Sequence, residues 1–275
     1  MRPKTYLLLL PLIFAANTFF SYPDSCIEIK DRQNLPPEVY RSLKNYDAIL
    51  IGEVHGNNES PQFAEGMVNL WLASGEKVLL GLEINEDNQD NIDKFIQSGD
   101  FEIIKKMPFF NRTSEDGRSS AAMANLIRSF YKKENMKIVC LDIPSTPGYP
   151  GNRDSAMALK AMAAAKANPK WKLITYTGNG HNKTELGPYG YPMGFLLANG
   201  SDKRLNTENV TTIDVVYEGG SSWFCNGTKG CKEYAQGNLS HELAQKYIFD
   251  NSFIFAGNEK KFFTRKISAS LPLNN

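Results

Sequence analysis

The sequence lacks an excess of charge of either sign. Its 275 residues include 31 lysines and arginines against 30 aspartates and glutamates, a formal net charge of +1, and no block of like charge interrupts the chain. Proteins that bind nucleic acid or dock on anionic membranes usually carry a basic patch or stripe. We therefore expect neither as a partner. The charge balance does not indicate the substrate, and the small-molecule or peptide substrate that we expect rests on the candidate site described below.

Long hydrophobic runs are also scarce. Arg2 and Lys4 precede one apolar run, 6–16, and a more polar stretch follows, which is the layout of a secretory signal peptide. No later segment reaches the roughly 18 apolar residues of a membrane-spanning helix. We expect residues 1–21 to be a signal peptide with an approximate cleavage site, an uncleaved anchor being the alternative. The mature chain is then periplasmic or secreted, without a membrane span.

Cysteine is rare, with four in the whole chain. Cys225 and Cys231 bracket a turn-rich segment, 226–230, that a local disulfide could close, as an oxidising compartment allows. Cys140 lies inside an apolar run and is expected to be a buried, inert thiol. A bridge between Cys26 and Cys140 is left open.

Asparagine, by contrast, is plentiful, and seven Asn-x-Ser/Thr sequons occur. Two of them, at Asn58 and Asn182, stand beside residues that we interpret below as catalytic, where a glycan would obstruct the site. This position favours a bacterial protein rather than a eukaryotic glycoprotein. The remaining sequons are at Asn111, Asn199, Asn209, Asn226 and Asn238.

Apolar runs with strand character alternate with segments of helical spacing, and no internal repeat interrupts them. This order predicts an α/β fold: a mainly parallel sheet with helices on both faces, three layers in all, formed by one domain over residues 22–275. Residues near 99–120 break the pattern and predict a loop or helical insertion. Strands are expected at 48–52, 77–82, 136–141, 172–177, 211–217 and 253–256, and helices at 62–73, 121–133, 153–167 and 240–249.

Four of these predicted strands end in ionisable side chains. They are Glu53 with His55, then Glu83, Asp142 and His181. Short strand–helix–strand crossovers make the strands parallel, so their carboxyl ends meet at one edge of the sheet. Ligands of open α/β sheets bind in the crevice at that edge. We therefore expect the active-site crevice there.

Two of the three histidines share a motif. Gly52-Glu53-Val54-His55 and Gly178-Asn179-Gly180-His181 are both Gly-x-x-His after an apolar strand. Histidine beside glutamate can be a metal ligand or a general base. The alternative interpretation is a pair of core histidines held by hydrogen bonds.

These motifs resemble a superfamily that groups the Tiki metalloproteases, the ChaN-like haem-binding lipoproteins and the erythromycin esterases. The resemblance covers about residues 46–194. The added combination of Asp116-Gly117-Arg118-Ser119-Ser120 and Arg153-Asp154 is similar to a set of exported bacterial members. The Glu-to-His spacing is one residue shorter here than in the esterase branch.

The resemblance implies Glu53, His55, Glu83 and His181 as the catalytic set. In a metal-dependent mechanism, the two histidines with one or both glutamates would bind a divalent ion such as Zn, Mn or Co and leave a position for water. In a metal-free mechanism, a histidine is the base and a glutamate orients it. The two mechanisms differ in their sensitivity to chelators.

A second group of residues is predicted to bind substrate. Arg118 and Arg153 could clamp an anionic group, with Asp116 and Asp154 holding the arginines and Asp142 beside them, or they could form surface salt bridges. Weaker candidates are Glu59, His241 and the loop residues Tyr189, Tyr191 and Met193.

The sequence therefore predicts an exported hydrolase of esters or amides. The main alternative is a haem- or metal-binding protein of the ChaN-like type without hydrolytic activity. A third hypothesis is an exported interaction protein on a degenerate enzyme scaffold.

Overall fold

The computed structural model describes ten stretches of the chain. They are residues 25–111, 116–145, 148, 150–187, 190–200, 204–226, 229–237, 241–246, 249–256 and 259–274. The predicted signal peptide and Tyr189 lie outside them, as does the side chain of His241. Among the described helices, none is both long enough and apolar enough to cross a membrane.

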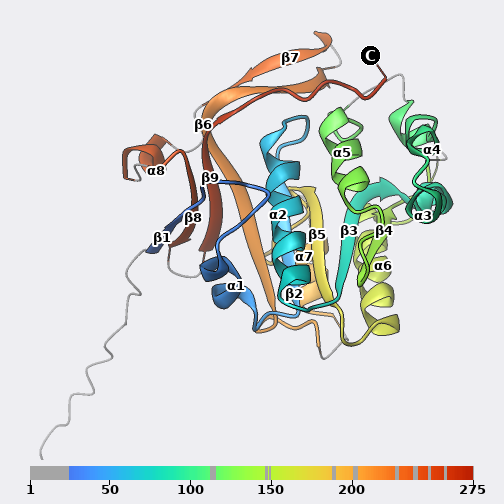
Figure 1. Cartoon of the computed structure of the whole chain (residues 1–275), viewed down its shortest axis with the longest axis horizontal. Helices are drawn as coiled ribbons and strands as arrows, with labels where there is room; N and C mark the ends of the chain where they lie inside the picture. Colours follow the sequence, from blue (N-terminus) through green and yellow to red (C-terminus); the bar gives the residue numbers. More distant parts are fainter. Residues whose placement is uncertain are drawn as a thin grey trace, which may run out of the picture.

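One nine-stranded sheet runs through the molecule in the order β1-β8-β9-β6-β2-β5-β3-β4, with β7 paired to β6 (Figure 1). The six neighbours from β9 to β4 are parallel, while β1, β8 and β7 pair antiparallel. The strands are β1 (Ser25–Glu28), β2 (Ala48–Glu53), β3 (Val78–Asn85), β4 (Met136–Asp142), β5 (Lys172–Gly178), β6 (Val210–Asn226), β7 (Gly230–Gln236), β8 (Asn251–Ala256) and β9 (Glu259–Ile267).

Helices cover both faces of the parallel part. Side chains alternate along a strand, so Ile49 and Ile51 of β2 face one layer, with Phe63 of α2, while Leu50 faces the other, with Met157 of α6. The α/β, three-layer prediction is confirmed. The helices are α1 (Pro37–Leu43), α2 (Glu59–Ala73), α3 (Gln89–Ser98), α4 (Phe101–Lys105), α5 (Ala121–Ser129), α6 (Arg153–Ala167), α7 (Met193–Ala198) and α8 (His241–Lys246), with short 3-10 turns η1 (Glu86–Asn88) and η2 (Pro108–Phe110).

The region predicted as an insertion near 99–120 contains α4 and η2. Phe109 and Phe110 of η2 are buried in the core with α3 and α5 residues, so this segment packs against the domain. Its last part, from Asp116, brings Arg118 to the edge of the sheet.

The carboxyl half of the chain differs most from the prediction. Strand β6 continues past the sheet edge and forms a hairpin with β7 that arches over the ends of the parallel strands (Figure 1). The predicted Cys225–Cys231 disulfide closes this hairpin and is confirmed. Cys26 and Cys140 are free thiols, so they form no bridge; Cys140 is buried, and burial raises the pKa of its thiol.

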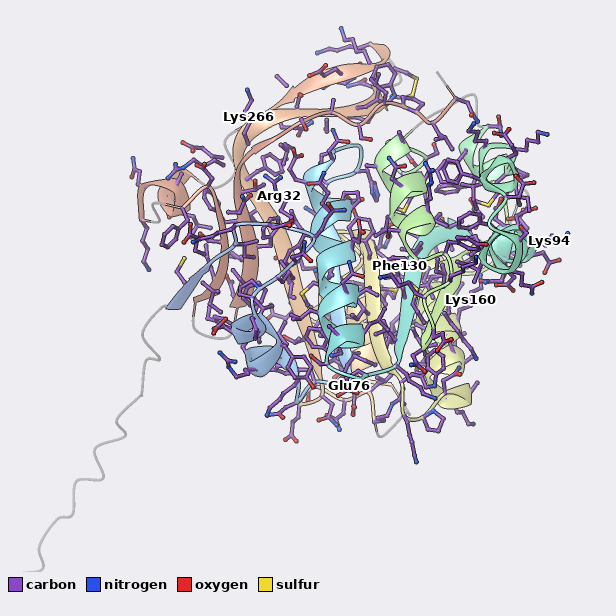
Figure 2. The ribbon with its side chains drawn as sticks, viewed as in Figure 1. Arg32, Glu76, Lys94, Phe130, Lys160 and Lys266 are labelled. Atoms are coloured by element: carbon purple, nitrogen blue, oxygen red, sulfur yellow. A yellow bond between two sulfur atoms is a disulfide. The ribbon has the colours of Figure 1, made fainter. Side chains whose placement is uncertain are left out.

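The loop between β1 and α1, residues 29–36, contacts strands β8 and β9 through the side chain of Arg32. Arg32 donates from Nε to Asn251 of β8 (3.0 Å), and from Nη2 to Thr264 of β9 (3.2 Å) (Figure 2). Because the loop leads into α1 and then β2, this anchor fixes the entry to the strand that carries the first histidine motif.

Candidate active site

Strand β2 delivers the first pair of the site. Glu53, its last residue, is 4% exposed, and its Oε1 lies 2.7 Å from Nδ1 of His55 in the following turn. A carboxylate can only accept at this contact, so Nδ1 of His55 carries a proton in both the neutral and the charged ring. The bond therefore directs Nε2 away from Glu53.

The glycines of both Gly-x-x-His motifs are required by space. A β-carbon at Gly178 would lie 3.0 Å from Nε2 of His55, and a β-carbon at Gly52 would lie 2.4 Å from the side chain of Asn182. Asn182 is fully buried and donates to Asp214 (3.0 Å), so the folded protein has no room for a glycan at this sequon. The motif glycines thus allow the two histidine turns to pack closely.

His55 is surrounded by acidic groups. Burial disfavours its imidazolium and lowers its pKa, but the carboxylates of Glu83 and Glu53, with a smaller contribution from Asp116, raise the pKa to about 9. Nε2 lies 3.7 Å from Oε2 of Glu83, beyond hydrogen-bond length. The side chain of His55 is 22% exposed, so the ring is not fully enclosed.

Glu83, near the end of β3, is the centre of the cluster. Its Oε2 accepts from the backbone N–H of Gly178 (2.7 Å), and its Oε1 accepts from Arg118 (3.2 Å) and from Arg153. Burial raises its pKa, but His55 and the two arginines outweigh that effect and lower it. Glu83 is therefore an ionised acceptor rather than a proton donor.

The two arginines bind acidic side chains of the protein. Asp142 at the end of β4 accepts from Arg118 Nη1 (2.7 Å) and from Arg153 Nε (2.7 Å). Burial raises the pKa of Asp142, but the hydrogen bond and charge of Arg153 lower it to about 2. Lys160 of α6 donates to the backbone oxygen of Asp142 (2.6 Å; Figure 2).

This pairing changes the roles that the sequence predicted. Asp142 is buried between two guanidinium groups, so it holds the arginines and is not open to a substrate. Arg118 is also enclosed, with 11% of its side chain exposed and Asp116 against it (2.7 Å from Nε). Arg153, 33% exposed, is the more accessible of the two cations.

His181 follows β5 and has a fixed tautomer. Arg153 donates from Nη1 to Nε2 of His181 (3.0 Å), so Nε2 is unprotonated and the proton lies on Nδ1, which donates to Asp154 (2.7 Å). Asp154 was expected to hold Arg153. Instead it holds His181 and accepts from the backbone N–H of Met193 (2.8 Å).

The structure thus brings together Glu53, His55, Glu83 and His181, with Nε2 of His181 3.7 Å from Glu83. Among the described weaker candidates, Met193 reaches the cluster only through its backbone N–H to Asp154, and its side chain is buried. Glu59 accepts from the backbone and hydroxyl of Ser268 (2.8 Å each), and Tyr191 is 58% exposed against Phe195. Two features were missed: Tyr176, behind Glu53, and the segment 268–274.

That carboxyl-terminal segment joins two loops of the site. Ser270 donates from its backbone to Gly56 (2.9 Å), and Ala121 donates to Leu271 (2.8 Å). Trp223 of the β6 hairpin also donates to Gly56 (2.9 Å). Only pairing between distant segments creates these contacts, so no local sequence signal marks them.

The cluster does not fit a divalent metal. Within the part of the chain that the structure describes, no three His, Cys, Asp or Glu side chains are arranged to hold an ion. Both oxygens of Glu83 already accept hydrogen bonds, and Arg153 donates to the nitrogen of His181 that would face a metal. Two guanidinium cations already pair with Glu83, which a metal would need as a ligand.

Comparison with known proteins supports the fold. No protein-family model matches the sequence, and a search of curated proteins finds no match. A succinoglycan biosynthesis protein (structural-genomics target BcR136) has a TM-score of 0.67 at 13% identity, over 90% of this chain and 95% of the other. A Bacillus cereus protein (target BcR135) has a TM-score of 0.64 at 14% identity, over 90% and 96%.

A mutant of erythromycin esterase EreC in its open conformation has a TM-score of 0.62 at 10% identity, over 91% of this chain and 95% of the esterase. All three similarities span nearly the whole of both chains, at an identity that supports the fold alone. The chain therefore shares the fold of erythromycin esterase EreC and the two structural-genomics proteins, which confirms the predicted resemblance at the level of the fold.

Proposed function

We propose that this protein is an exported hydrolase of esters or amides that activates water with His55. The observation that carries the proposal is the Glu53–His55 pair, in which Nδ1 binds Glu53 and Nε2 lies 3.7 Å from Glu83. The shared fold of erythromycin esterase EreC supports a hydrolase.

The attacking water is assigned to a position beside His55 and Glu83. Nε2 and Oε2 are 3.7 Å apart, so a water to one side of the line that joins them can lie about 2.8 Å from both. Neutral His55 would take the proton of this water on Nε2, while Glu53 accepts from Nδ1 and stabilises the imidazolium that forms. Glu83 orients the water and keeps its charge, because the arginines hold it ionised.

The negative charge that develops on the substrate carbonyl needs a cation. Arg153 is the more exposed arginine of the cluster, and His181 and Asp142 fix its guanidinium on two sides. We assign it to the developing oxyanion, since a preorganised donor stabilises that charge without reorganisation. The imidazolium of His55 then donates its proton to the leaving group.

Export and the choice of cofactor belong to the same proposal. The predicted signal peptide and the Cys225–Cys231 disulfide support a periplasmic or secreted location. The metal-dependent mechanism does not agree with the hydrogen bonds of the cluster, and haem binding stays a prediction. Elemental analysis of the purified protein tests the first, and a Soret band after haem addition tests the second.

The proposal is tested with a panel of chromogenic esters and amides. We expect turnover by the wild type that a chelator leaves unchanged, and a loss of at least about a hundredfold in His55→Asn, which lacks the base. Lys94→Ala, on the exposed side of α3, is the matched control and should retain full turnover. Equal turnover in the wild type and His55→Asn would refute the role of His55.

A further inference from the structure

Three polar atoms behind His55 are buried without a hydrogen-bond partner among the described residues. They are Oε2 of Glu53, Oγ of Ser60 and Oη of Tyr176. Buried polar groups in native proteins nearly always have a hydrogen-bond partner, so three neighbouring groups without one need an explanation. The proposed mechanism uses only the other oxygen of Glu53.

The topology places these three side chains on one face of the sheet. Strands β2 and β5 are parallel with Ile51 opposite Tyr176, so Tyr176 lies on the same face as Ile51 and, two residues on, Glu53. Helix α2 covers this face, and Ser60 lies in its first turn. Tyr176 is 1% exposed, so it cannot touch a substrate.

The pKa of Tyr176 depends on both Glu53 and Ser60. Burial and then the charge of Glu53, with a smaller effect of Glu83, raise the pKa of Tyr176 well above its ordinary value, while Ser60 acts in the opposite sense. The phenol therefore keeps its proton. Hydrogen bonding to Glu53 contributes to the raised pKa and hydrogen bonding to Ser60 opposes it, so both groups lie close to the phenol hydroxyl.

Only one direction of donation satisfies all three groups. An ionised carboxylate accepts and never donates, so Tyr176 must donate to Oε2 of Glu53. The hydroxyl of Ser60 can then donate to the phenol oxygen, which agrees with its effect on Tyr176. On the other side, His55 donates from Nδ1 to Oε1 of Glu53.

We propose that Tyr176 is a positioning residue, whose hydroxyl donates to Oε2 of Glu53 and fixes this carboxylate while it holds His55. With donors at both oxygens, the carboxylate cannot turn about its last bond, and the imidazole stays aimed at the water position. The effect on turnover rests on the proposed hydrolase function, but the hydrogen bond itself does not.

The test compares Tyr176→Phe with Tyr217→Phe, a matched loss of one buried hydroxyl, because Tyr217 is also 1% exposed and bonds to Gln236 in the hairpin. In the full chain, the proton NMR resonance of the Nδ1–H of His55 is assigned by its absence in His55→Asn. We expect Tyr176→Phe to shift or broaden this resonance, and to lower kcat about tenfold or more at constant KM. Tyr217→Phe should change neither.

An unchanged resonance in folded Tyr176→Phe would overturn the proposal, because the ring would then only fill the core. If Tyr176→Phe does not fold, Ser60→Ala replaces it: the same resonance should shift by a smaller amount, and no shift would overturn the proposal. Because the resonance needs no substrate, a shift in a protein without turnover would support this hydrogen bond and refute the hydrolase function.

Discussion

The charge on His55 should stabilise the folded protein below neutral pH and cease to do so at high pH. In the folded state burial lowers the pKa of His55, but Glu83 and Glu53 raise it to about 9, against 6.5 for the free side chain. A folded pKa above the unfolded one gives stability that is fully present below pH 6.5 and is lost as pH rises through 9. The difference between the folded and the unfolded pKa corresponds to roughly 3 kcal/mol in the free energy of unfolding.

The perturbation is His55→Asn, which keeps a donor near Oε1 of Glu53 and removes the charge. Urea unfolding of both proteins at pH 6 and pH 10 gives their free energies of unfolding. The wild type should exceed the variant by about 3 kcal/mol more at pH 6 than at pH 10. Groups that do not interact with His55 titrate alike in both proteins and cancel. A difference that is the same at both pH values would refute the electrostatic account of the site.

Three further predictions follow from the packing and pairing of the site. Gly178→Ala places a β-carbon 3.0 Å from Nε2 of His55 and should abolish turnover in the ester assay, whereas Gly180→Ala, with no described heavy atom within 4 Å, should keep it. Arg153→Met removes one of the two guanidinium partners of Glu83 and Asp142 and should lower the free energy of unfolding in urea by about 1.5 to 3 kcal/mol; a loss below 1 kcal/mol would contradict the pairing. Replacing both hairpin cysteines by alanine should cost only about 2 kcal/mol, because the loop is short, and a calorimetric scan with and without reductant checks this value.

The parallel core and its polar edge could be predicted because their signals are local. An apolar run that ends in Glu53, Glu83 or His181 predicts a buried strand and also shows which polar side chain stands at its carboxyl end. Parallel topology then converts sequence order into proximity. This is why four side chains from three strands meet as expected.

The partners of those side chains were less predictable, because proximity along the chain is a poor guide to pairing. Asp154 follows Arg153 directly and was expected to hold it, yet successive residues of a helix point in different directions. Asp154 therefore reaches His181 instead, while Arg153 binds Asp142 and Glu83.

The other features that the sequence did not predict depend on contacts between distant segments of the chain. Tyr176 stands in an apolar strand, where an aromatic ring usually fills the core, so its hydroxyl gave no signal. Strand β9 and the long hairpin of β6 depend on pairing that no local pattern encodes. The segment that fastens the loops of Gly56 and Ser119 is likewise nonlocal.

The most direct test of the central claim is the pH dependence of kcat/KM for the best ester substrate. This ratio reports the free enzyme, in which only neutral His55 can accept a proton from water. The account predicts a rise of about tenfold per pH unit that levels off near pH 9, where the pKa of His55 lies. A profile that is flat from pH 6 to 10, or that levels off near 6.5, would contradict it.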